Sequence, residues 1–197
     1  MDGLDRLLRP QSIAVIGGGV WCANLVEQCR KIGFAGDLWP VHPRRDSIAG
    51  VPAFPSIEAL PAAPDAAFIG INRDSTIQAV AALAARGAGG AVCFASGFRE
   101  TEPHAGDGAD RQAALLAAAG GMTLLGPNCY GLINYLDGVA LWPDQHGGRR
   151  VERGVALVTQ SSNIAINLTM QARGLPVAYV VTVGNQAQTG LSAIAAA

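Results

Sequence analysis

Short, continuously apolar segments alternate along this 197-residue chain with longer segments rich in alanine and leucine. A strand that is apolar on both faces must be covered on both faces, as in a parallel sheet enclosed by helices. The sequence predicts strands at 12–17, 37–41, 65–71, 90–95, 122–126, 154–160 and 177–184. It predicts helices at 24–32, 75–86, 110–119, 163–173 and from 190 onward. This order predicts an α/β fold built on a Rossmann-like, doubly wound parallel sheet.

The character of the chain changes after Tyr135, where LDGVALWPDQHGGRRVERG is rich in glycine, proline and charge. Such a composition is typical of an irregular connection between domains. We therefore expect a Rossmann-like domain over 1–136, a linker over 137–152 and the beginning of a second domain over 153–197. Two strands and their helices cannot close a core of their own, so we expect this second domain to be truncated.

Charge and hydropathy exclude two classes of partner. Half of the residues are hydrophobic and the formal net charge is −1, with Lys31 as the one lysine, so the basic surface of a nucleic-acid binder is missing. No apolar run reaches the roughly 18 residues of a membrane span, and the N-terminus lacks the basic and apolar regions of a signal peptide. We expect a cytoplasmic protein with neither nucleic acid nor membrane as a partner.

The cysteines and histidines do not form a recognisable metal site. Four cysteines are scattered without a CxxC pair, so we expect reduced thiols packed mostly in the core, with neither a zinc site nor a disulfide framework. His42, His104 and His146 stand apart in predicted loops, which supports neither a metal cluster nor a catalytic triad. We expect His104 and His146 at the surface.

Ligands of an open parallel sheet bind outside the carboxyl ends of its strands. Gly17, Gly18 and Gly19 follow the first strand there, and backbone N–H groups of such a turn can converge on a phosphate. A turn from strand to helix also needs glycine for steric reasons alone. The spacing departs from G-x-G-x-x-G because Trp21 and Cys22 stand where a third glycine would be.

The second strand ends in LWPVHPRR, which places Arg44 and Arg45 where an NAD-binding domain usually has an acidic residue for the ribose hydroxyls. Arginine would instead pair with a phosphate on the ribose through charge-assisted, bidentate hydrogen bonds. This favours NADP or coenzyme A, whose ribose carries a 3′-phosphate. The alternative is that both arginines simply end a solvated loop.

Two further strand ends carry polar groups. The loop GPNCYG presents Asn128, a donor and acceptor, beside Cys129, for which the sequence offers no base to make it a nucleophile. The segment QSSN places Ser161, Ser162 and Asn163 at the start of a helix. Such side chains are ordinary helix caps, and a helix start with spare hydroxyls is also an anion site.

Several motifs together resemble one family. SIAVIGGG, GFAGDLWPVHP, GAVCFASGF, GPNCYGLIN, GVALVTQSSNIA and VTVGNQA occur in the order found in the N-terminal part of the NDP-forming acyl-CoA synthetases, relatives of the succinyl-CoA synthetase α subunit. The resemblance implies a CoA-binding domain followed by flavodoxin-like domains. It implies the reaction of a carboxylic acid, CoA and an NTP to acyl-CoA, NDP and phosphate, through an acyl phosphate and a phosphohistidine.

The resemblance also carries over to particular positions. It implies that CoA runs from the glycine turn and the second-strand loop, past the third and fourth strands, to the GPNC loop. The CoA-binding residues that it implies are Gly17, Gly18, Gly19, Val41, Pro43, Arg44, Arg45, Ile71, Asn72, Ser96, Gly97, Asn128 and Cys129. Ser161, Ser162 and Asn163 would form the helix start that receives the phosphate of the swinging histidine.

This chain departs from the family pattern in ways that matter. The family phosphohistidine lies beyond the segment present, none of the three histidines matches it, and the ATP-grasp domain is absent. We therefore expect this chain to bind CoA without completing catalysis. ATP or GTP with Mg²⁺, an ATP-grasp domain or subunit and a homo-oligomeric assembly are implied for the full-length enzyme only. QSSN replaces the usual QSG, VHP replaces VNP, and the first loop is shorter than usual.

Two other functions remain open at this point. The chain could be a non-catalytic module that senses CoA or acyl-CoA for a protein acetyltransferase or another partner. A weaker alternative is an NADP-binding oxidoreductase domain.

Overall fold

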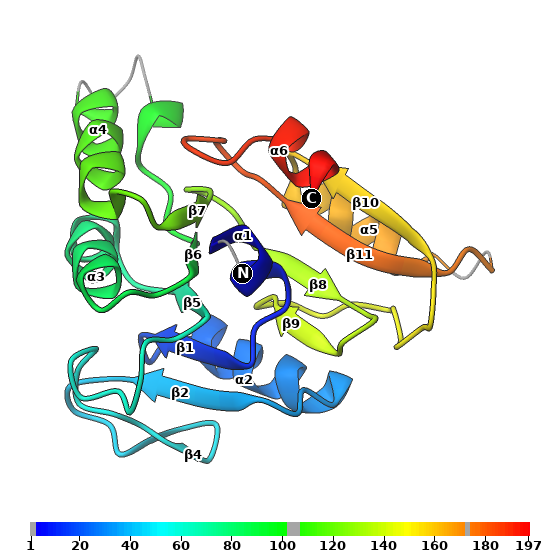
Figure 1. Ribbon diagram of the computed structural model, residues 1–197, viewed down its shortest axis with the longest axis horizontal. Coiled ribbons are helices and arrows are strands. Elements are labelled where there is room, and N and C mark those ends of the chain that lie inside the picture. The colour runs from blue at the N-terminus through cyan, green and yellow to red at the C-terminus, as the bar shows by residue number, and fades with distance from the viewer. Residues whose placement is uncertain (1–2, 102–106, 172–173) are drawn as a thin grey trace.

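A computed structural model describes residues 3–101, 107–171 and 174–197 of the chain (Figure 1). Its central sheet has five parallel strands in the order β2-β1-β5-β6-β7. These are β1 (Ser12–Ile16), β2 (Asp37–Val41), β5 (Ala66–Ile69), β6 (Gly90–Cys93) and β7 (Thr123–Leu125). The chain leaves β1 for β2 on one side and returns to β5 on the other, so the topological switch point lies between β1 and β5. The predicted doubly wound parallel sheet is confirmed.

Both faces of this sheet are buried, as its continuously apolar strands predict. On β1, Ile13 and Val15 belong to one hydrophobic cluster, while Ala14 and Ile16 belong to another on the opposite face. Helix α2 (Val20–Ile32) covers the first face, and α3 (Arg73–Ala85) and α4 (Gly108–Ala119) pack side by side on the second. Helix α2 begins one turn earlier than predicted, directly after Gly19.

A second sheet of four strands lies beside the first, in the order β10-β11-β8-β9. Its members are β8 (Leu132–Asn134), β9 (Val139–Leu141), β10 (Val155–Thr159) and β11 (Val177–Thr182). Helix α5 (Ser162–Thr169) connects the parallel pair β10 and β11, and α6 (Leu191–Ala196) follows. The helix predicted at 163–173 is thus shorter, and positions 172–173, like His104, lie outside the described residues.

The irregular linker predicted over 137–152 is wrong at β9, which forms an antiparallel hairpin with β8. The buried Asn134 shapes the turn between them, because its Oδ1 accepts hydrogen bonds from the backbone N–H groups of Leu136 and Asp137 at 2.9 and 3.0 Å. Gly138 completes the turn with a φ of 74°. The dipeptide Asp137-Gly138 is typical of a β-hairpin turn. It was not recognised as one because the surrounding sequence is rich in glycine and charged residues. The division into domains stays a prediction.

One hydrophobic cluster runs through both sheets. It joins Val92 and Leu125 of the first sheet to Ile133 and Val180 of the second. Helix α2 takes part as well, since the buried Cys29 thiol donates a hydrogen bond to the Ala140 carbonyl of β9 at 3.1 Å. The two sheets therefore share one hydrophobic core.

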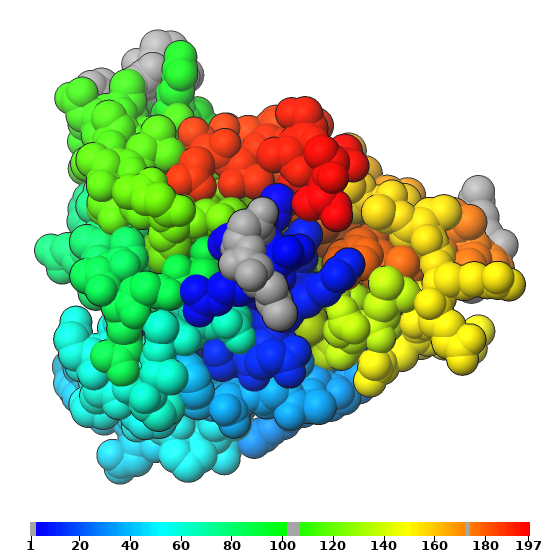
Figure 2. Space-filling view, viewed as in Figure 1, coloured from blue at the N-terminus to red at the C-terminus, as the bar shows by residue number. Residues whose placement is uncertain are grey.

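The N-terminal helix α1 (Gly3–Leu8), which the sequence did not predict, lies at the junction of the two halves (Figures 1 and 2). Its Leu7 and Leu8 are buried in the shared cluster. The Leu8 carbonyl accepts a hydrogen bond from Asn134 Nδ2 at 3.1 Å, which ties the helix to the hairpin turn. Three short elements were not predicted either, namely β3 (Ser47–Ile48), β4 (Val51–Pro52) and the 3₁₀ turn Arg99–Thr101.

Four cysteine thiols are buried and free, as the sequence predicts. Within the described ranges, no helix has the length and apolar character needed to cross a membrane.

His146, predicted at the surface, is instead buried, with 4% of its surface exposed. Its Nδ1 lies 3.1 Å from the hydroxyl of the buried Tyr135, while its Nε2 is buried without a hydrogen-bond partner among the described residues. Burial, with a smaller contribution from the charge of Lys31, lowers the pKa of His146 from 6.5 to about 4.

We expect this histidine to make the free energy of unfolding depend on pH. In the unfolded chain the imidazole takes up a proton near pH 6.5, whereas in the folded chain it does so only near pH 4. Stability therefore falls as the pH drops through that window, by on the order of 2–3 kcal/mol from this group. Urea denaturation at pH 7 and pH 4.5 should show a smaller loss for His146→Gln than for the wild type; equal losses would contradict the assignment.

Candidate functional site

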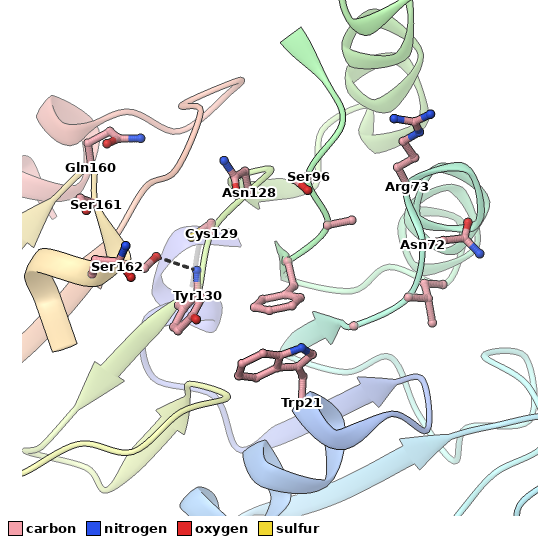
Figure 3. A pocket seen from close by; sticks show the side chains of 15 residues that line it. Trp21, Asn72, Arg73, Ser96, Asn128, Cys129, Tyr130, Gln160, Ser161 and Ser162 are labelled. Atoms are coloured by element: carbon pink, nitrogen blue, oxygen red, sulfur yellow. Dashed lines mark hydrogen bonds between the residues drawn. The ribbon is translucent and has the colours of Figure 1, made fainter. Parts of the chain in front are cut away.

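A cavity of about 750 Å³ opens at the carboxyl ends of the strands, where both sheets contribute residues (Figure 3). The switch point of the parallel sheet lies at this edge, which is where doubly wound folds bind ligands. The lining residues are Trp21, Gly70, Ile71, Asn72, Arg73, Phe94, Ala95, Ser96, Asn128, Cys129, Tyr130, Gln160, Ser161, Ser162 and Asn163.

The cavity brings together eight of the residues singled out from the sequence. These are Ile71, Asn72, Ser96, Asn128, Cys129, Ser161, Ser162 and Asn163. The other predicted positions are not part of its lining, namely Gly17, Gly18, Gly19, Val41, Pro43, Arg44, Arg45 and Gly97. The role of all these residues in CoA binding stays a prediction.

The glycine turn and the second-strand loop lie against each other. A Cβ built on Gly18 would stand 2.4 Å from Cδ2 of the His42 ring and 3.3 Å from Cδ of Arg45. A Cβ on Gly19 would meet nothing within 4 Å. Gly18 is therefore required for the contact between the two loops, whereas Gly19 faces open space.

Helix α2 has Gly19 at its N-cap position, and glycine offers no side chain to cap the helix. By contrast, Asn72 caps α3 by accepting from Ser75 N at 2.9 Å, and Ser161 caps α5 by accepting from Ile164 N at 3.4 Å. The first-turn N–H groups of a helix need partners from outside the helix, and an anion is one such partner. The α2 start is thus the one of these three helix starts left open for a ligand.

His42 organises the arginine loop. Its Nδ1 accepts hydrogen bonds from the backbone N–H groups of both Arg44 and Arg45, each at 3.1 Å. Both arginine side chains are exposed, and neither pairs with an acidic side chain in the described part of the chain. The loop therefore presents two uncompensated guanidinium groups next to the open start of α2.

The predicted anion site at α5 is partly occupied by the protein itself. Ser161 acts as the helix cap, as described above, and Ser162 Oγ accepts a hydrogen bond from Tyr130 N at 3.2 Å (Figure 3). Both oxygens already accept a hydrogen bond, while each hydroxyl can still donate one. The Ser162 bond also ties the start of α5 to the loop between β7 and β8 at one side of the cavity.

The GPNC loop contributes both Asn128 and Cys129 to the cavity lining, but the Cys129 side chain is buried there, with 1% of its surface exposed. Asn128 is exposed and adopts a φ of 56°, a left-handed conformation that asparagine tolerates well. The Cys129 thiol donates to the Thr182 carbonyl at 2.9 Å, and burial raises its pKa to about 11. A buried, protonated thiol is a poor nucleophile, in agreement with the missing base.

Ser96 and Gly97, which follow β6, differ in their exposure. Ser96 is exposed at the cavity, whereas Gly97 is buried and its N–H donates to Glu100 at 2.6 Å. Arg73, which lines the cavity, lies over Gly97, where an added Cβ would stand 2.5 Å from its Nη1. Gly97 therefore supports Arg73 and has no N–H to spare.

Sequence reasoning missed the aromatic lining of the cavity, which consists of Trp21, Phe94 and Tyr130. The available signal was weak: Phe94 ends a predicted strand and Tyr130 sits inside GPNCYG, but nothing in the pattern places Trp21 beside them. Across residues 3–101, 107–171 and 174–197, no three His, Cys, Asp or Glu side chains gather as a metal site.

The doubly wound sheet, with a glycine turn after its first strand and a cavity at the carboxyl ends of its strands, is the architecture of a Rossmann-like α/β domain. Residues 11–135 match the CoA binding domain family, and the chain belongs to this family. This agrees with the resemblance seen in the sequence.

The similar proteins are CoA ligases. Over 197 residues, the chain is 36% identical to a trans-feruloyl-CoA synthase from an unknown prokaryotic organism, with 95% of this chain and 28% of that protein covered. It is 29% identical over 192 residues to the ADP-forming 4-hydroxybutyrate–CoA ligase of Nitrosopumilus maritimus, with 92% and 26% covered. The chain thus spans little more than a quarter of the length of these relatives.

A solved structure has the same fold. The dinucleotide-forming acetyl-coenzyme A synthetase 1 of Ca. Korarchaeum cryptofilum, in complex with phosphate and ADP, superimposes with a TM-score of 0.86 at 25% identity. The alignment covers 98% of this chain and 42% of that one, so both sheets of the present chain have counterparts there.

The glycine turn allows a matched test. Gly18→Ala should push the His42 ring away from the two backbone N–H groups that donate hydrogen bonds to its Nδ1. We expect this to lower the free energy of unfolding by about 1–2 kcal/mol. Gly19→Ala should leave stability unchanged, because its Cβ enters open space. Thermal unfolding of both variants compares the two positions, and equal melting temperatures would show that His42 is not held as described.

Proposed function

We propose that this chain is the CoA-binding part of an NDP-forming acyl-CoA synthetase. The observation that carries the proposal is the pairing of the open α2 start with two exposed, unpaired arginines on the loop that His42 holds. An NADP-type dinucleotide shares the need for a ribose phosphate site, but the family match favours CoA.

CoA would lie along the edge of the parallel sheet. Its ribose phosphate and diphosphate bind at Arg44, Arg45 and the glycine turn, beside β2 and β1. The pantetheine passes Asn72 and Ser96, after β5 and β6, and brings its thiol to the Asn128 loop. This path follows the strand order β2-β1-β5-β6-β7 from one side of the sheet to the other.

The longer protein would convert a carboxylic acid, CoA and an NTP to acyl-CoA, NDP and phosphate. The phosphohistidine and the ATP-grasp part that binds ATP or GTP with Mg²⁺ belong to chain outside this sequence or to a separate subunit. Ser161, Ser162 and Asn163 supply the helix start at which the phosphate arrives, with hydroxyl hydrogens as donors. We place the protein in the cytoplasm, with a homo-oligomer as one assembly to test.

A direct prediction concerns the arginines. The double variant Arg44→Ala, Arg45→Ala should lose about tenfold to a hundredfold in affinity for CoA, since charged hydrogen bonds contribute on the order of 1.5–3 kcal/mol. The same variant should bind 3′-dephospho-CoA almost as the wild type does. Isothermal titration calorimetry measures both ligands.

Arg153→Ala provides the control for this experiment, because Arg153 is exposed but precedes β10, at the opposite end of that strand from the cavity. It should leave both affinities unchanged. Equal weakening of CoA and 3′-dephospho-CoA by the double variant would show that the arginines do not read the 3′-phosphate.

Titration of the wild-type chain with CoA and with NADP tests the function itself. We expect CoA to bind and NADP to bind far more weakly, because NADP carries its phosphate on the 2′-oxygen and has no pantetheine for the cavity. Tight binding of NADP without binding of CoA would reverse the conclusion in favour of an oxidoreductase domain.

A further inference from the structure

Five aromatic rings from distant parts of the chain make one continuous cluster beneath the cavity. Trp21 lies 5.3 Å from Phe94 and 6.1 Å from Tyr130, measured between ring centroids, and Phe94 lies 5.5 Å from Tyr130. Behind them, Phe68 packs on Phe94 at 5.6 Å and Trp142 packs edge-on against Tyr130 at 5.4 Å. We call Trp21, Phe94 and Tyr130, which line the cavity, the aromatic wall.

The aromatic wall is held in place before any ligand binds. Phe68 and Trp142 are fully buried, and each fixes one ring of the wall from behind. Tyr130 is held further through its backbone N–H, which donates to Ser162. The three rings of the aromatic wall are tilted against one another by 43° to 53°, so they form an uneven surface instead of a flat stack.

Trp21 is the exposed member of this wall. It keeps 37% of its surface open although it sits on the first turn of α2, directly above two other rings. A large exposed aromatic side chain beside a cavity is typical of a surface that a ligand covers. Figure 3 shows Trp21 and Tyr130 on one side of the cavity, with Asn72 and Arg73 across from them.

The position of the wall decides which part of a ligand it meets. Phe94 follows β6 and Tyr130 follows β7, and Trp21 reaches both rings from the first turn of α2, which follows β1. Arg44 and Arg45 instead follow β2, at the opposite edge of the sheet from β7. A CoA molecule whose ribose phosphate sits on the arginines has its adenine at that edge too. The end that reaches β6 and β7 is the thiol, together with the acyl group that it carries.

We propose that Trp21, Phe94 and Tyr130 select a flat aromatic acyl group, so that the substrate is an aromatic carboxylic acid. This inference rests on the proposed function. The carboxyl carbon lies between the Asn128 loop and the α5 start, and the aryl ring lies on the wall. Edge-to-face contacts with tilted rings favour an aromatic ring over an aliphatic group of equal size.

Binding of three CoA thioesters to the 197-residue chain tests the proposal. Cinnamoyl-CoA should bind about tenfold tighter than acetyl-CoA, and also tighter than 3-cyclohexylpropanoyl-CoA, which has the same carbon number without an aromatic ring. Trp21→Ala should remove most of the cinnamoyl advantage while the affinity for CoA itself stays within about twofold. Trp21→Phe should keep most of the advantage because it retains a ring.

Val155→Ala is the control, since Val155 begins β10 at the end of that strand away from the cavity, is 40% exposed and does not line the cavity. It should leave all affinities unchanged. If CoA binds but cinnamoyl-CoA shows no advantage over acetyl-CoA or over the cyclohexyl thioester, the wall does not select an aromatic group and the proposed function stands. If none of the thioesters nor CoA binds, both proposals fail.

Discussion

The burial of the parallel sheet on both faces is the constraint on which the rest of the structure depends. Because alternate residues of β1 enter two different clusters, helices must cover both sides, and every connection must cross from one end of the sheet to the other. All five carboxyl ends then meet at one edge. The glycine turn, the arginine loop, Ser96 and the Asn128 loop come together there because of topology, although they are far apart in the sequence.

The loops at that edge are held by side chains with few alternatives. His42 accepts hydrogen bonds from two backbone N–H groups, and its ring occupies the space that a side chain at position 18 would need. A single imidazole therefore sets the conformation of the loop that carries both arginines. Ser162 fixes a second loop at the cavity, because its hydroxyl oxygen accepts a hydrogen bond from the backbone N–H of Tyr130. These contacts prepare the site before a ligand arrives, which lowers the entropic cost of binding.

The local sequence pattern alone was enough to predict the parallel sheet. A strand such as 12–17, in which apolar residues point to both sides, must be buried on both faces. The hairpin β8–β9 could not be read in this way, because its three-residue strands gain their burial from α2 and the second sheet. His146 was placed at the surface because only the fold reveals Tyr135 as its partner. In the site, the polar strand ends were found, but ring contacts between positions 21, 94 and 130 depend on tertiary packing that no spacing encodes.

The aromatic wall is continuous with the core, and this has an evolutionary consequence. Trp142 and Phe68 stabilise the fold as fully buried side chains and at the same time fix the rings that face the cavity. A substitution that improves packing at either position also reshapes the surface offered to the ligand. Ligand preference and thermal stability in this chain are therefore subject to the same mutations, and neither can drift independently of the other.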